Sequence, residues 1–423
     1  MRRWVIAVAA AVGVLALPAT AAAATCGDDG TTQLFDSQGY YFDFTQALAT
    51  ADHDQPFATF YDSGSNAPTG TPPGPLSNSD EYDDWGALFV GGTAESNMYF
   101  SADNNSCSDP GPGQHNYPVV TINGLQVQRK IFVNPTAGSV PGVRILNLIS
   151  NPGGSPVTTT VQVGDLLSGD NEGDLGSDDE TATRASSNGD SLTSPADFWS
   201  VTNDDTTTTS DNTLAHIVDG MRGAVKANVF QVGPGTDTQP QDNLIYGWTV
   251  TVPPGQTIGL MSFEVQQGVA GLAAPPQVTG AVTQANAYEN APLATLYQGM
   301  STSEQQSVVN WNPSNAFTAT VKGKKLLVNV SAPGTVAVSD AKANLSAAAA
   351  KKKKKSLGLK PSSASGNPPT ITVKLNLSKS AKQKLRKKGK VKVKANITFT
   401  PNGGFASTQT QKLKIKSKSK KKK

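Results

Sequence analysis

The stretch YPVVTINGLQVQRKIFV, residues 117–133, alternates apolar and polar side chains on either side of Asn123-Gly124. A period of two is the pattern of a half-buried β-strand, and Asn-Gly is favoured in the two-residue type I′ turn of a hairpin. The stretch therefore predicts two antiparallel strands joined by a tight turn.

The same pattern recurs along the chain after this hairpin. Four further segments, separated by clusters of Gly, Pro, Asn and Asp, are VRILNLIS (143–150), SPVTTTVQVGDLL (155–167), AVKANVFQV (224–232) and YGWTVTVPPGQTIGLMSFEVQQ (246–267). Such spacing is typical of a large antiparallel sandwich, and the fold class we predict is mainly β. The alternation is lost over 278–310, where Ser301-x-x-Glu304 is a capping box that predicts a helix.

Charge divides the chain into two unlike parts. Residues 25–320 carry 6 Lys and Arg against 32 Asp and Glu, a formal charge of −26, whereas residues 321–423 carry 28 against 1, or +27. The overall charge of +3 hides this contrast, which favours separate domains. We expect a signal peptide (1–24), an acidic β-sandwich domain (25–277), a helical linker (278–314) and a smaller basic immunoglobulin-like β-sandwich (315–423).

The basic part is built from short alternating segments. KKLLVNVSAPGTVAVSD (324–340) predicts a hairpin with a Pro-Gly turn, TITVKLNLS (370–378) predicts a strand, and SKSAKQKLRKKG (378–389) predicts a short helix that stops at its glycine. In KVKVK (390–394) the lysines Lys390, Lys392 and Lys394 fall on the face opposite the valines. Much of the lysine is therefore expected on the solvent side of a half-buried sheet.

This order of a hairpin, a Lys-rich insert, LNLSKSAKQKLRKKGKVKVKANITFTPNGG (375–404) and a final basic strand resembles an immunoglobulin-like tail module of secreted actinobacterial proteins. The resemblance covers about the last 100 residues. More loosely, VQRKIFV, VRILNLISNP, GDLGSDDETATRASSNGD and DFWSVTNDD resemble the β-supersandwich domains of bacterial carbohydrate enzymes. The resemblance implies an adhesive, surface or carbohydrate-associated protein, and it carries over no catalytic residue.

The first residues indicate export. Arg2 and Arg3 precede an apolar run and the triplet Ala22-Ala23-Ala24, which together predict a cleaved secretory signal peptide and no membrane span afterwards. In an oxidising compartment the only two cysteines, Cys26 and Cys107, are expected to form a disulfide. The predicted location is therefore extracellular or in the cell envelope.

Two stretches are candidate binding sites. The acidic loop Gly169–Glu180 offers hard oxygen ligands for Ca²⁺ on a flexible backbone, and its candidate ligands are Asp170, Glu172, Asp174 and Asp178. Its spacing departs from the EF-hand pattern, so a solvated acidic loop is the alternative and no other cofactor is expected. Tyr82 and Trp85 follow a Pro/Gly/Ser-rich loop and are candidates for sugar binding, whereas Trp199 and Trp248 are expected in the core.

No nucleophile elbow, zinc-protease motif, Walker loop or dinucleotide fingerprint occurs, which favours a non-catalytic binding or structural protein. A carbohydrate-binding or glycoside-processing protein is the alternative. Export, the acidic first part and the few aromatic residues among the basic ones argue against a nucleic-acid partner. The lysine run that includes Lys351, Lys352 and Lys353, together with the sheet lysines, predicts attraction to anionic envelope polymers or polysaccharide. The sequence makes no prediction about oligomeric state.

Overall fold

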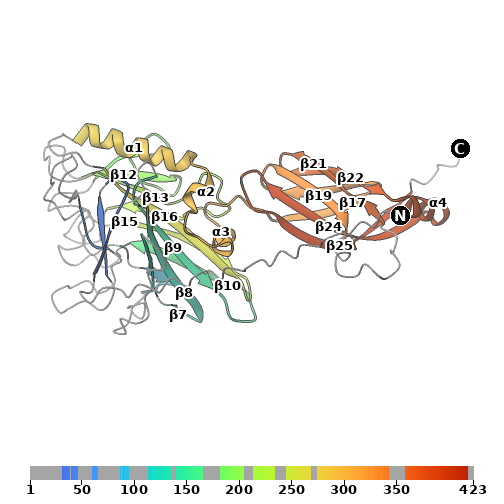
Figure 1. Cartoon of the computed structure of the whole chain (residues 1–423), viewed down its shortest axis with the longest axis horizontal. Coiled ribbons are helices and arrows are strands. Elements are labelled where there is room, and N and C mark those ends of the chain that lie inside the picture. The colour runs from blue at the N-terminus through green and yellow to red at the C-terminus, as the bar shows by residue number, and fades with distance from the viewer. Residues whose placement is uncertain are drawn as a thin grey trace, which may run out of the picture.

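A computed structural model gives the fold. It describes residues 31–38, 40–45, 60–64, 86, 88–94, 113–117, 119–134, 140–164, 182–203, 213–233, 244–267, 274–342 and 358–417. All sheets within these residues are antiparallel, and the prediction of a mainly β protein is confirmed. Two bodies of stacked sheets follow one another along the long axis of the molecule (Figure 1). We call them the first sandwich and the second sandwich.

The first sandwich contains an eight-stranded and a five-stranded sheet, with a three-stranded sheet beside them. The eight-stranded sheet has the order β11 (Ala182–Ser186), β12 (Trp199–Asn203), β13 (Thr213–Ile217), β16 (Thr257–Gln267), β9 (Val143–Ser150), β8 (Leu125–Val133) and β6 (Gln114–Asn116), and β7 (Val120–Ile122) also pairs with β8. The five-stranded sheet has the order β14 (Val229–Val232), β15 (Leu244–Val252), β10 (Val157–Gly164), β4 (Leu88–Val90) and β5 (Thr93–Ala94). The small sheet joins β1 (Thr31–Phe35), β2 (Tyr41–Thr45) and β3 (Phe60–Gly64).

The predicted hairpin around Asn123-Gly124 is confirmed. Ile122 pairs with Leu125, and Asn123 and Gly124 have φ angles of 50° and 79°, as a type I′ turn requires. The Asn123 side-chain amide also donates to the carbonyl of Val90 at 2.8 Å. The turn therefore sets the register of β7 and β8 and also ties this hairpin to the opposite sheet.

Both faces of the eight-stranded sheet are covered at its centre, over β13 and β16. Its inner face shares a hydrophobic core with the five-stranded sheet, and this core includes Ile145, Leu260 and Trp248. Its outer face packs against α1 (Ala274–Asn290), α2 (Leu293–Leu296) and α3 (Thr302–Ser307), with α1 lying over β12, β13 and β16 (Figure 1). The predicted core positions of Trp199 and Trp248 are confirmed, since these side chains are 4% and 1% exposed.

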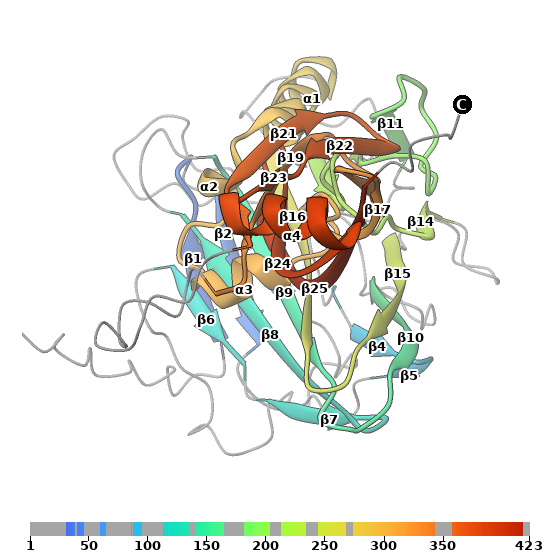
Figure 2. The ribbon, with the colours of Figure 1, turned by 90° about the vertical axis from the view of Figure 1, so that its right-hand side faces the viewer.

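The second sandwich has two main sheets and a single core between them. One sheet has the order β17 (Phe317–Lys322), β18 (Lys325–Val330) and β22 (Thr370–Lys374). The other has the order β21 (Ser362–Gly366), β19 (Gly334–Asp340), β24 (Lys390–Pro401) and β25 (Ser407–Lys416), and a short pair joins β20 (Leu359–Lys360) to β23 (Asn376–Leu377). Helix α4 (Lys379–Lys388) packs against β24 and lies at the end of the second sandwich that faces away from the first (Figures 1 and 2).

The predicted hairpin over 324–340 is wrong. Strand β18 pairs with β17 and β22, whereas β19 pairs with β21 and β24, so the Pro333-Gly334 link carries the chain from one sheet to the other. A Cβ atom at Gly334 would collide with the carbonyl oxygen of Thr400, and glycine thus lets β19 start close against β24. The apolar faces of β18 and β19 are buried because their two sheets stack face to face across the core. If the two strands paired as a hairpin, they would lie in one sheet and these faces would not meet.

An aromatic pair forms one of the contacts between the two sandwiches. Phe405, in the turn after β24, stacks on Tyr297 with ring centres 6.4 Å apart. The Asn315 side chain donates to the Phe405 carbonyl at 3.2 Å. Among the described residues, no helix has the length and apolar character needed to cross a membrane.

Candidate functional site

Three of the candidate site residues, Lys390, Lys392 and Lys394, lie within the described part of the chain. The others lie outside it, and their roles remain predictions. They are Cys26, Cys107, Tyr82, Trp85, Asp170, Glu172, Asp174, Asp178, Lys351, Lys352 and Lys353. Within the described ranges, no group of three or more His, Cys, Asp or Glu side chains could hold a metal ion.

The first candidate site is a ladder of facing lysines on β24 and β25. In the register of these strands, Lys390 faces Lys416, Lys392 faces Lys414 and Lys394 faces Lys412. All these side chains are exposed, and the valine, leucine and isoleucine residues between them are buried. We call the set Lys390, Lys392, Lys394, Lys412, Lys414 and Lys416 the lysine ribbon.

Helix α4 adds further positive charge at one end of this ribbon. Ser378 caps its N-terminus by accepting from the Ala381 N–H at 3.2 Å, and Gly389 ends it with a left-handed φ of 64°. The Ser417 N–H donates to the Gly389 carbonyl at 2.9 Å, so the end of β25 is fixed beside the end of the helix. The basic residues of α4 are all exposed: Lys379, Lys382, Lys384, Arg386, Lys387 and Lys388.

No nearby acid compensates this charge within the described residues. The stretch 358–417 holds 14 Lys and Arg and no Asp or Glu. The one acid of the second sandwich, Asp340, is 4% exposed and accepts from the backbone N–H groups of Gly358 and Leu359. Like charges directly opposite on neighbouring strands destabilise a sheet. The ribbon is therefore maintained at a cost in stability.

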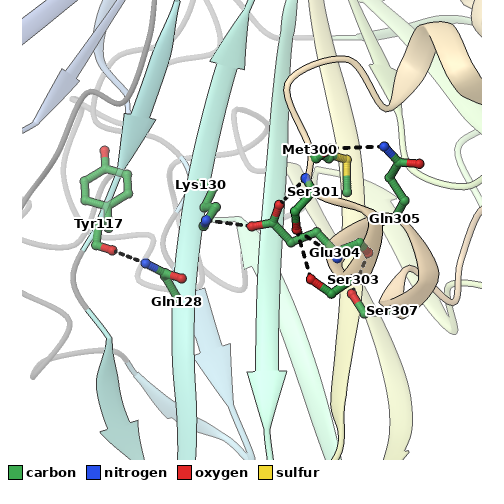
Figure 3. A network of polar contacts seen from close by, with 9 residues as sticks. All are labelled: Tyr117, Gln128, Lys130, Met300, Ser301, Ser303, Glu304, Gln305 and Ser307. Atoms are coloured by element: carbon green, nitrogen blue, oxygen red, sulfur yellow. Dashed lines mark hydrogen bonds and ion pairs between the residues drawn. The ribbon is translucent and has the colours of Figure 1, made fainter. Parts of the chain in front are cut away.

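The second candidate site is a hollow on the outer face of the eight-stranded sheet, next to α3. Figure 3 draws four of its lining residues, Gln128, Ser303, Glu304 and Ser307. It has a volume of about 280 Å³. We call it the polar groove, and it is lined by Val119, Gln126, Gln128, Leu148, Ser150, Thr257, Ser303, Glu304 and Ser307. Six of the nine lining residues carry an amide or a hydroxyl group.

An ion pair fixes the position of α3 over the strands at this groove. Lys130 Nζ on β8 lies 2.6 Å from Glu304 Oε1, and the second carboxylate oxygen accepts from the Ser301 N–H at 2.7 Å (Figure 3). Burial acts to raise the pKa of Glu304, but the hydrogen bonds from Lys130 and Ser301 outweigh it, and the pKa lies below its usual 4.5. The Glu304 carboxylate is therefore ionised at neutral pH, and it forms an ion pair with Lys130.

Only part of this arrangement could be predicted from the sequence. The capping box of Ser301 and Glu304 was predicted and is confirmed. The partner of Glu304 on β8 was not predicted, because the chain folds back over a long separation to bring α3 to that strand. The alternation that places Lys130 on the same face as Gln126 and Gln128 was the one signal available.

Inside the first sandwich, a hydroxyl, an imidazole and a carboxylate are linked by hydrogen bonds in the sequence found in some catalytic sites. Thr202 Oγ1 lies 2.8 Å from His216 Nε2, and His216 Nδ1 lies 2.6 Å from Glu264 Oε2. Tyr246, from the opposite sheet, donates to Glu264 Oε1 at 3.1 Å. A hydroxyl, imidazole and carboxylate in this order occur in nucleophilic enzymes. Here all four side chains have 0% exposure, so the network serves to hold the two sheets together.

Comparisons with known proteins give no family. Neither the family models nor the curated protein sequences match this chain. A solved structure described as a polysaccharide lyase is similar at 9% sequence identity and a TM-score of 0.30, over 93% of this chain and 47% of that one. This chain therefore spans about half the length of that neighbour. A likeness of this degree carries no information about activity.

Proposed function

We propose that this is a secreted or cell-envelope protein without catalytic activity, and that its second sandwich binds anionic polymers through the lysine ribbon. The observation that carries the proposal is the register of β24 and β25, which sets three exposed lysine pairs side by side. The predicted signal peptide supports export. The resemblance of the basic part to the immunoglobulin-like tail modules of secreted actinobacterial proteins agrees with this location.

The chemistry of the ribbon favours a long polyanion over a small ligand. Its lysines follow two extended strands, and α4, with its exposed basic residues, lies at one end of these strands (Figure 1). A polymer with repeated negative charges can contact several of these cations at once and relieve their mutual repulsion. Such contacts weaken as salt rises, because exposed charges are screened over about 8–10 Å at 0.1–0.15 M ionic strength.

The polymer we propose is one found outside the cell, such as a polyphosphodiester or a polyuronate of the envelope. The acidic part of the same protein, with its formal charge of −26 over 25–320, is a competing partner within or between molecules. Competition of this kind would lower the affinity for added polyanion without abolishing it. The binding assay therefore uses the whole chain from residue 25 onward.

The test is retention of that chain on immobilised lipoteichoic acid and on polygalacturonate, eluted with a NaCl gradient. The ribbon variant combines Lys392→Gln, Lys394→Gln, Lys412→Gln and Lys414→Gln. We expect its affinity at 50 mM NaCl to fall about tenfold or more, since each lost contact removes part of a salt-dependent attraction.

The matched control removes the same charge from the other sheet of the second sandwich. It combines Lys322→Gln, Lys324→Gln, Lys325→Gln and Lys374→Gln, all at exposed positions. We expect the control to elute at a higher salt concentration than the ribbon variant. Equal elution of the two variants would show that net charge alone determines binding, and the ribbon would lose its proposed role.

A further inference from the structure

We propose that the polar groove beside α3 binds a short segment of an uncharged saccharide. This site is separate from the lysine ribbon and lies on the first sandwich. Its volume of about 280 Å³ is close to the lower end of ligand pockets, which is about 300 Å³. A groove of this size fits part of a longer chain.

The lining suits a ligand with many hydroxyl groups. Gln126 and Gln128 point from the outer face of β8, and each amide offers both a donor and an acceptor. Hydroxyl groups from β9, β16 and α3 complete the polar surface, and each has an oxygen that can accept a hydrogen bond from a ligand. Two apolar side chains, Leu148 and the 56% exposed Val119, provide contact for the C–H faces of a sugar ring.

The charges at the groove favour a neutral ligand. The Glu304 carboxylate is engaged on both oxygens, by Lys130 and by the Ser301 N–H, and Lys130 is held by the same carboxylate. An anion or a cation would have to compete with this pair, whereas a hydroxyl group can add to it as a further donor or acceptor. The recognition we infer is therefore hydrogen bonding to hydroxyl groups.

Several groups of the groove are already fixed in place, which lowers the entropy cost of binding. Gln128 Nε2 donates to the Tyr117 carbonyl at 3.0 Å, and Ser307 Oγ donates to the Glu304 carbonyl at 2.7 Å (Figure 3). Ser150 Oγ and Thr257 Oγ1 lie 2.7 Å apart and orient each other. Gln126 and Ser303 are exposed at the rim, where substitution will not disturb the core.

The experiment is affinity gel electrophoresis of the chain from residue 25 onward in gels that contain dextran, galactomannan or xyloglucan. Each gel contains 0.5 M NaCl, which shortens the screening length to well below 10 Å and suppresses attraction to the lysine ribbon. We expect at least one of these neutral polysaccharides to slow the protein. The double variant Gln126→Ala/Ser303→Ala should bind that polysaccharide about tenfold more weakly.

The matched control is Thr158→Ala/Thr251→Ala, which removes two exposed hydroxyl groups from the five-stranded sheet. It should migrate like the unsubstituted protein. The proposal is overturned if none of the three polysaccharides slows the protein, or if the groove variant and the control bind equally. Binding to polyanions at low salt is measured separately, so failure of the groove leaves the lysine ribbon to be judged on its own result.

Discussion

The two sandwiches differ in where they place their charged and polar side chains. The first sandwich buries ionisable groups, among them Arg129, His216, Asp219 and Glu264. In the described part of the second sandwich, Asp340 is the one buried ionisable side chain, and its core is otherwise aliphatic with a few aromatic rings. The first sandwich thus uses charge to join its sheets, and the second leaves its charge on the surface.

The number of covered faces explains this difference. In the first sandwich β13 is buried at every position, because the five-stranded sheet lies on one side and α1 on the other. Any polar residue in such a strand must find a partner inside the protein. In the second sandwich β24 alternates buried positions with exposed ones over 390–395 and with half-buried ones over 396–401, since one face of that sheet is open to solvent. Cations can gather on the open face without being desolvated.

The substitution Glu264→Ala should give the largest effect. It removes the acceptor of His216 and Tyr246 in a fully buried site, and we expect the free energy of unfolding to fall by about 3–5 kcal/mol. Denaturant unfolding followed by tryptophan fluorescence reports this loss from the first sandwich, because residues 315–423 contain no tryptophan. The control Glu289→Ala on α1 should cost about 0.5 kcal/mol. A loss below about 1 kcal/mol for Glu264→Ala would contradict the role of the network.

A smaller effect is expected from Ile397→Val in the core of the second sandwich. Ile397 has 0% exposure, and the loss of one methylene group should cost about 0.5–1.5 kcal/mol. Hydrogen–deuterium exchange of β24 and β25 peptides should speed up several-fold, while tryptophan-detected unfolding stays unchanged. Thr408→Ser deletes a methyl group at an exposed position of β25 and should leave exchange unaltered. A shift in the tryptophan transition would show that the two sandwiches unfold together.

The smallest effect is expected in the lysine ribbon. Lys414→Glu places an opposite charge in front of Lys392, and we expect a gain of about 0.2–1 kcal/mol at low salt, measured by the same hydrogen exchange. The gain should disappear in 1 M NaCl, where the screening length is only about 3 Å and charges further apart hardly interact. The double variant Lys392→Glu/Lys414→Glu restores a like-charged pair and should cancel the gain. Destabilisation by Lys414→Glu at low salt would refute the view that the ribbon costs stability.

Local patterns predicted the parts of the fold that depend on neighbouring residues. The alternation of lysine with valine, leucine or isoleucine correctly placed the ribbon on an open face, and Asn123-Gly124 correctly marked a hairpin. The Pro333-Gly334 link was misread, because a turn between alternating strands looks the same whether the second strand pairs with the first or crosses to another sheet. The Pro253-Gly255 turn makes the same kind of crossing between β15 and β16.

The two candidate sites also differ in how far the sequence predicts them. The ribbon lysines of β24 could be selected from the sequence, whereas the polar groove could not, since it depends on Lys130 and Glu304 meeting across a long separation. The sequence by itself determined the β-strands, the capping box and the separation of acidic from basic charge, because each of these follows from side chains a few positions apart. Only the tertiary structure decided which sheets stack, which polar residues are buried together and where α3 lies on the strands. Those outcomes depend on burying apolar faces and pairing desolvated polar groups between distant segments.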